Sequence, residues 1–438
     1  MRRLLTIVFC LTGWCVAAQE PSVKEWTLRE CLDYAEQNSI GVKQSRNVQL
    51  SGMEDTQQAR AELFPSLVAT TSHSYTNYPS SEVRDNDSYS GTYGLRAGLT
   101  LYEGGRLRKA LEQSRVQNRI DALDVEQTIV DLRIAIVRAY MQCLYAAEAV
   151  GINRSTAEVS LARCERAEQM WRAGSISRVD YAQLRSQYTD DEYQVVVAAT
   201  SLDDYKLQLK QLLELDITEE MNPAAVRKVE EERIVSVLPA KHEVYRAALE
   251  FMPRVERGEL AVESAELGRK IARAGFFPSV SLSASVGTGH MSGGNTGSGS
   301  QIWNRFNENV GLSIDIPIFS NRRNRTAVNK ANIAVDNSLL ERAAIEKEIL
   351  KQVESAYLDA SSAQARYLAA SEKERYAAES FELTSEQFLL GAKNTVELLT
   401  AQNELTAARQ EVLQAKYTAL LNIELLNIYQ GLEPSAIY

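Results

Sequence analysis

The chain has 438 residues, of which 24% are charged and 45% hydrophobic, and its formal net charge is −10. The length allows two or more ordinary domains, and the small number of prolines (nine) favours long helices. The negative charge argues against a nucleic acid or an anionic surface as a partner.

The first residues have the pattern of an export signal. Arg2 and Arg3 supply the positive end, an apolar run covers 4–16, and small residues follow. We therefore predict a signal peptide over 1–18. Its removal takes away two positive charges, so the mature chain has a net charge near −12.

The rest of the chain lacks the roughly 18 consecutive apolar residues that a membrane-spanning helix needs. Beyond the predicted signal, the cysteines are Cys31, Cys143 and Cys164. Cys143 and Cys164 fall on one predicted helix, about 30 Å apart, and cannot pair there. We expect all three to be buried as small hydrophobic side chains.

An internal repeat organises the chain. The sequence ARAELFPS at 59–66 returns as ARAGFFPS at 272–279 after a one-residue shift at its start. Three further matches keep a spacing of about 217 residues and join 98–102 to 315–319, 139–140 to 356–357, and 171–174 to 388–391. A repeat this long predicts a duplicated domain with copies at 19–220 and 221–438.

Each copy reads as helix, strand, strand, long helix, turn and long helix. The first begins with a helix over 28–63, capped by Thr27 and Glu30. The predicted strands are 66–78, 88–102, 279–290 and 307–319. The predicted long helices are 105–172, 177–215, 325–390 and 395–429.

The predicted strands alternate between apolar residues and Gly, Ser or charged residues. About ten residues is the length of a tilted membrane-spanning strand. Lipid on one face and water on the other would explain the pattern. A soluble antiparallel sheet shows the same alternation.

Four strands cannot close a barrel in lipid, because an open edge leaves backbone groups unpaired. Three chains would supply twelve strands, an even number with a water-filled bore. Their helices, about 100 Å long, would extend as a hollow cylinder across a periplasm.

The chain resembles TolC-like outer-membrane efflux proteins in three features. These are the duplicated unit, the two Phe-Pro-Ser junctions at 64–66 and 277–279, and the Trp/Phe-x-x-Gly hairpin ends at 171–174 and 388–391. The resemblance implies a mainly α fold with a trimeric twelve-stranded membrane β-barrel continuous with an α-helical periplasmic tunnel. It also implies docking, through the hairpin ends, to an inner-membrane pump and a periplasmic adaptor.

The resemblance further implies a gate at the periplasmic end of the tunnel. Glu397 matches an acidic ring, where carboxylates near an axis would raise one another's pKa and attract cations. Thr400 stands where a second acidic residue is common. Lys393 replaces an arginine that latches the closed state, with Asp180 as its candidate partner, and Phe388 replaces a hydrogen-bonding tyrosine.

Adaptor docking is expected at the hairpin ends. The residues assigned to it are Trp171, Gly174, Ser175, Ser177, Gly391, Ala392 and Asn394. On the strands, Arg96 and Asp315 fall on the predicted lumen face, where they would tune the passage or serve as solvated wall charges.

Two other classes of protein compete with an exit duct. An enzyme lacks support, because no nucleophile motif is present and His73, His242 and His290 do not have metal-ligand spacing. We therefore expect no cofactor and no metal. A structural periplasmic coiled-coil protein would account for the helices, but it would not need amphipathic strands.

Overall fold

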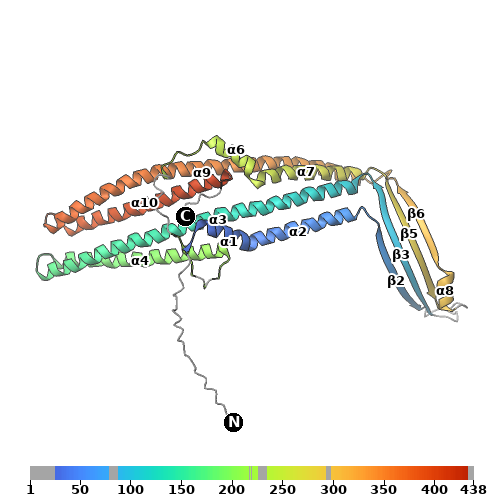
Figure 1. Cartoon of the computed structure of the whole chain (residues 1–438), viewed down its shortest axis with the longest axis horizontal. Coiled ribbons are helices and arrows are strands. Elements are labelled where there is room, and N and C mark those ends of the chain that lie inside the picture. The colour runs from blue at the N-terminus through green and yellow to red at the C-terminus, as the bar shows by residue number, and fades with distance from the viewer. Residues whose placement is uncertain are drawn as a thin grey trace, which may run out of the picture.

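The fold was determined as a computed structural model (Figure 1). It describes residues 25–77, 87–216, 218, 220–224, 234–292 and 297–432. The predicted signal peptide, residues 1–18, lies outside the described residues.

Two long helical hairpins extend side by side away from a β-sheet (Figure 1). The first joins α3 (Arg106–Arg172) to α4 (Arg178–Leu213), and the second joins α9 (Arg323–Leu389) to α10 (Thr395–Tyr429). Helices α3 and α9 have 67 residues each, which corresponds to about 100 Å. Neither is strongly amphipathic along its whole length, so the helices must pack against one another to hide apolar surface.

Shorter helices complete each copy. They are α1 (Leu28–Asn38) and α2 (Ile40–Ala61), then α6 (Lys241–Phe251) and α7 (Pro253–Ala274). The expected capping box is present, since Thr27 and Glu30 bond to each other's backbone N–H.

The expectation of one helix over 28–63 is wrong at Ser39. Its backbone leaves the helical region at ψ 128°, and its hydroxyl caps α2 by accepting from the N–H of Val42. The second copy breaks at the equivalent junction, where Pro253 opens α7. Proline suits the first position of a helix because its missing N–H needs no partner there.

The main core lies where α1 and α6 pack against the long helices. Tyr140 is fully buried there, and its hydroxyl lies 3.1 Å from the carbonyl of Trp26 and 3.2 Å from that of Ala224. These carbonyls flank a small parallel pairing of β1 (Glu25–Trp26) with β4 (Asn222–Pro223). Cys31, Cys143 and Cys164 are buried and free, which confirms the expectation for all three.

The sheet consists of β2 (Ser66–Asn77), β3 (Asp87–Glu103), β5 (Ser279–Met291) and β6 (Asn307–Asp315) in the order β2-β3-β5-β6. All neighbours are antiparallel. The hairpin of each copy therefore meets the other at β3 and β5, and β2 and β6 form the outer edges. A short helix, α8 (Ser298–Asn304), precedes β6 at the end remote from the helices (Figure 1).

The predicted strand 307–319 ends early, at Asp315. Asp315 pairs with Ser279, the first residue of β5, so the part of β5 that could pair with β6 ends there. Pro317 also lacks a backbone N–H to donate to a neighbouring strand. The apolar side chains of Ile316 and Ile318 consequently lie outside the strand, largely exposed.

Candidate gate, docking ends and membrane-facing sheet

The two hairpin ends share one turn geometry. Gly174 and Gly391 both have φ of +76°, a conformation that costs a residue with a side chain about 1 kcal/mol or more. The N–H groups of Ser175 and Ala392 then bond back into the last turns of α3 and α9, at 2.8 and 2.9 Å. This arrangement ends a helix and reverses the chain.

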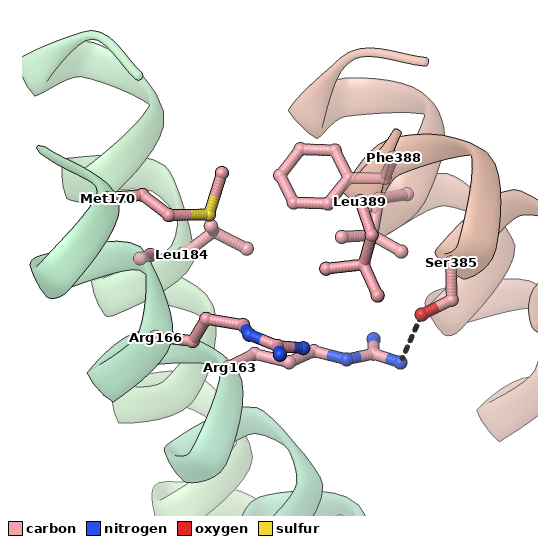
Figure 2. Close-up of a pocket in the computed structure, with 9 residues that line it drawn as sticks. Arg163, Arg166, Met170, Leu184, Ser385, Phe388 and Leu389 are labelled. Atoms are coloured by element: carbon pink, nitrogen blue, oxygen red, sulfur yellow. Dashed lines mark hydrogen bonds between the residues drawn. The ribbon is translucent and has the colours of Figure 1, made fainter. Parts of the chain in front are cut away.

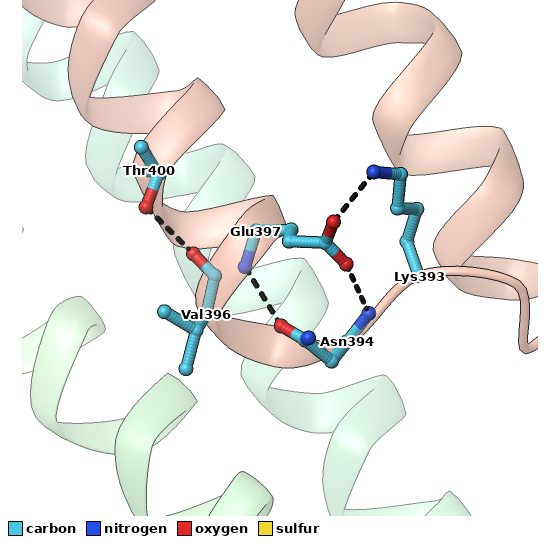
Figure 3. A network of polar contacts seen from close by, with 5 residues as sticks. All are labelled: Lys393, Asn394, Val396, Glu397 and Thr400. Atoms are coloured by element: carbon cyan, nitrogen blue, oxygen red, sulfur yellow. Dashed lines mark hydrogen bonds and ion pairs between the residues drawn. The ribbon is translucent and has the colours of Figure 1, made fainter.

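Each returning helix starts with a capping box. Ser177 caps α4 and Asp180 bonds back to it, and Asn394 caps α10 with Glu397 in the reciprocal role (Figure 3). Asp180 and Glu397 are 217 residues apart, so they are the same position in the two copies. Both carboxylates therefore have a structural role at a helix N-terminus, where negative charge is favoured.

Glu397 also forms an ion pair with Lys393, at 2.5 Å (Figure 3). Lys393 and the N–H of Asn394 hold the pKa of Glu397 below its usual range. The rise in pKa expected for an acidic ring would require Glu397 residues of neighbouring chains. Within one chain the pKa of Glu397 is lowered.

The expected pair between Lys393 and Asp180 is not formed within the chain, and this expectation is corrected. Lys393 turns to Glu397, four residues away on its own hairpin. Asp180 instead accepts a hydrogen bond of 2.8 Å from the hydroxyl of Thr395 on the other hairpin. The Ser177 and Thr395 hydroxyls lower the pKa of Asp180. Nothing in the sequence singles out Thr395 for this contact except its position next to the N-cap residue Asn394.

The aromatic residues at equivalent places in the two hairpins differ in environment. Phe388 packs on a small apolar cluster of Ala167, Leu184 and Leu398 between the hairpins. Trp171 is 37% exposed and stacks on Tyr181, with ring centroids 5.4 Å apart. The second hairpin end is thus anchored inward, and the first presents an aromatic surface.

Thr400 does not contribute a free hydroxyl to the gate region, since it donates to the carbonyl of Val396 at 2.9 Å (Figure 3). It lines an open polar groove between α4 and α10 together with Gln183 and Asn403. On α10, the hydroxyl of Thr400 and the amide of Asn403 stand where the resemblance places a second acidic ring, and the carboxylate of Asp190 on α4 lines the same groove.

A cavity of about 70 Å³ lies between the two hairpins, close to their turns (Figure 2). Arg163 and Arg166 form its polar side, and Met170, Leu184 and Phe388 its apolar side.

The Arg163 guanidinium donates to Gln402 at 2.8 Å and lies 4.3 Å from the centre of the Phe381 ring. Burial lowers the pKa of Arg163.

A buried polar network next to this cavity was not foreseen from the sequence. Ser160 donates to Asp191, and Gln402 donates to Ser160 at 2.7 Å and to Asp191 at 3.1 Å. All three side chains are at most 7% exposed. They come from α3, α4 and α10, so the network ties the two hairpins together. A polar residue on an otherwise apolar helix face is its only sequence signal.

The sheet has two chemically different faces. The register places Leu67, Leu95, Val286, Leu312 and similar residues on one face. Most of these side chains are exposed in the chain, for example Leu67 at 72% and Leu312 at 60%. A face of this kind requires lipid or protein to cover it.

The other face carries serine, threonine, glycine and asparagine. Arg96 lies on it opposite Ser285, and Asp315 lies on it opposite Ser279. Both charged residues are exposed. Their shared face is the polar one, as the alternation predicted.

Exposed aromatic residues gather at the two ends of the sheet. Phe64, Phe276, Phe277 and Phe319 flank the ends of the strands that join the helices. Tyr75, Tyr89, Trp303 and Phe306 lie near the opposite ends. Aromatic belts at two levels, with an apolar band between them, are typical of strands that cross a bilayer. Within the described residues, no helix is both long enough and apolar enough to cross a membrane.

Comparison with known proteins agrees with this geometry. The family described as "Outer membrane efflux protein" matches residues 32–214 and 244–429. The chain belongs to this family. Its matched part covers both helical hairpins and both strand pairs, and the family consists of channel proteins of the outer membrane.

Individual relatives cover most of the chain. The alkaline protease secretion protein AprF of Pseudomonas aeruginosa is 24% identical, over 85% of this chain and 77% of AprF. The outer membrane protein TolC of Escherichia coli K12 is 21% identical, over 96% of this chain and 85% of TolC. A crystal structure of CusC superposes with a TM-score of 0.81 at 20% identity and covers 93% of this chain and 92% of that one.

These likenesses establish the fold as that of an outer-membrane channel protomer, mainly helical with a membrane β-sheet. The location follows from the family: the protein lies in the outer membrane of a Gram-negative bacterium, and its helices extend into the periplasm.

Proposed function

We propose that the protein is the outer-membrane exit duct of a tripartite efflux or type I secretion system. Three copies would form the duct, and an inner-membrane pump with a periplasmic adaptor would deliver the cargo. The duct itself would conduct passively. Its relatives include an alkaline protease secretion protein and a cation efflux system protein. One passive duct can serve both uses.

The observation that carries the proposal is a sheet with an exposed apolar face and two outer edges, β2 and β6, which have no further neighbouring strand among the described residues. Unpaired backbone groups in lipid cost several kcal/mol each. Pairing β6 of one copy with β2 of the next removes every edge when three copies close a ring of twelve strands. Arg96 and Asp315 would then face the water-filled bore.

The gate and the docking surfaces would lie at the hairpin ends. Glu397 from three copies would form the acidic constriction, with Lys393 moderating its charge and Thr400 leaving the next level neutral. Phe388 and Asp180 would hold the two hairpins in the closed arrangement. The adaptor would contact the turn residues and the exposed Trp171 and Leu390, which is 84% exposed.

The test is purification followed by current measurement in a planar lipid bilayer. We expect extraction only with detergent, a molecular mass of three chains, and ohmic conductance. A stable monomer in buffer without detergent would show a structural coiled-coil protein instead and would overturn the proposal.

A further inference from the structure

Two of the three histidines of the chain meet on the sheet. His73 on β2 and His290 on β5 both pair with Gly91 of β3. They are 217 residues apart, so they are equivalent positions of the two copies. A Cβ built on Gly91 would lie 3.1 Å from Nδ1 of His73 and 3.0 Å from Nδ1 of His290. Both nitrogens therefore converge over one residue that has no side chain.

The surroundings of His73 make Nδ1 the ring nitrogen that accepts, and therefore the one that can bind a metal. The Tyr89 hydroxyl lies 2.8 Å from Nδ1, and the Thr71 hydroxyl lies 3.2 Å from Nε2. If Tyr89 donates to Nδ1, Nε2 carries the proton and donates to Thr71. A histidine that ligates a metal usually donates its other N–H to such an acceptor, which fixes the ring.

His290 has an unsatisfied nitrogen at the same place. Its Nδ1 is buried and lacks a hydrogen-bond partner among the described residues. The rings of Tyr89 and Tyr93 enclose it, with centroids 5.7 and 6.0 Å from the His290 ring. Buried polar atoms without a partner are rare in folded proteins, so this nitrogen points to a missing ligand.

We propose that His73 and His290 bind one divalent transition-metal ion of the kind that prefers imidazole, such as Zn²⁺ or Cu²⁺. Nitrogen–metal bonds of about 2.0–2.1 Å require the two rings to close further over Gly91. Tyr89, released from its hydrogen bond to His73, gives up its phenol proton to solvent and supplies a third ligand through its oxygen, and water completes the shell.

Two features make the site reachable and limit its strength. His73 is exposed and His290 half-buried. Both lie on the apolar face but next to the Tyr75–Tyr89 pair at the remote end of the sheet, so an ion would reach them from the water at the membrane surface. No cluster of three or more His, Cys, Asp or Glu side chains in the described part of the chain could hold a metal ion. The site therefore depends on two imidazoles and a phenol. Bound metal would link β2 of the first repeat to β5 of the second repeat within one chain.

The experiment measures metal binding by the mature protein, purified in detergent without a histidine tag. Calorimetric titration with Zn²⁺ should give one ion per chain. His73→Gln and His290→Gln should each weaken binding about tenfold or more. His242→Gln, which changes the exposed third histidine on α6, is the matched control and should bind as the parent does.

Gly91→Ala tests the geometry with both histidines kept. Its Cβ would lie 2.5 Å from Cε1 of His290, so the ring must move and binding should weaken. Electron paramagnetic resonance of bound Cu²⁺ should show two nitrogen ligands in the parent and one in each histidine variant. Absence of stoichiometric binding, or binding unchanged in the His73→Gln/His290→Gln double variant that still assembles, would overturn the proposal.

Discussion

The hydroxyl of Thr395 donates a hydrogen bond of 2.8 Å to a carboxylate oxygen of Asp180. Thr395 is the first residue of α10, and Asp180 lies in the first turn of α4. This bond links the two hairpins at their ends, where an opening movement would have to separate them. A single hydrogen bond to a charged group contributes about 1.5–3 kcal/mol at most, so it joins the two hairpin ends without locking them together.

Thr395→Val should therefore favour opening. Valine keeps the shape of threonine but cannot donate to Asp180. We expect a larger single-channel conductance in a planar bilayer, or more frequent openings. Thr406→Val is the matched control, because the Thr406 hydroxyl bonds only to the Gln402 carbonyl of its own helix. Equal currents in parent and Thr395→Val would show that the bond does not restrain the gate.

The hairpin ends should withstand mild acid. Folding lowers the pKa of both Asp180 and Glu397, so their stabilising contacts are complete above the unfolded values and are lost as the pH falls through the lowered ones. We expect the conductance to be constant from pH 7 to about pH 5 and to change only below about pH 4. The Asp180→Asn/Glu397→Gln variant should lose this transition. A transition near pH 6 in the parent that Glu397→Gln removes would show instead that the three Glu397 carboxylates raise one another's pKa.

Charge at the gate can be changed in both directions. Lys393→Gln removes the partner of Glu397, and Thr400→Asp adds a second acidic level; both should strengthen block of the current by divalent cations. Glu397→Gln should weaken it, since neutral amides attract cations less. The measurement is the concentration of Mg²⁺ that halves the current. Identical values for all three variants would remove Glu397 from the conduction path.

The buried network of Ser160, Asp191 and Gln402 should stabilise the packing of the two hairpins. Asp191→Ala leaves Ser160 and Gln402 without their shared acceptor in a buried site, at a cost of about 1–3 kcal/mol. We expect faster hydrogen exchange in α3, α4 and α10 around these residues. Asp190→Ala, the exposed neighbour, should leave exchange unchanged. Similar exchange in both variants would mean that the network does not join the hairpins.

Two glycines should respond to alanine with opposite sign. Gly151 lies inside α3 with open space around it, so Gly151→Ala should stabilise the helix by about 0.5–1 kcal/mol. Gly391 also has open space but has φ of +76°, so Gly391→Ala should destabilise the turn by about 1 kcal/mol or more. Thermal unfolding of the assembled protein measures both changes. Equal shifts would show that the turn tolerates a side chain.

Much of the fold was predictable because its signals are local. The uninterrupted helical pattern, the glycine at each hairpin end and the period-two strands each report on neighbouring residues. The 217-residue repeat then showed that Asp180 and Glu397 are equivalent. The break at Ser39 and the early end of β6 were missed, because the first depends on a single cap and the second on where the partner strand begins.

The amino-acid sequence by itself determined the type of the elements, the approximate length of most of them, the duplication and the two faces of the sheet, since spacing along the chain encodes all of these. Only the tertiary structure decided which side chains meet. Lys393 pairs with Glu397, Thr395 reaches Asp180, Gln402 joins Ser160 to Asp191, and His73 faces His290 across Gly91. The last three contacts span more than 200 residues, and helix packing and strand register, rather than sequence spacing, bring such groups within bonding distance.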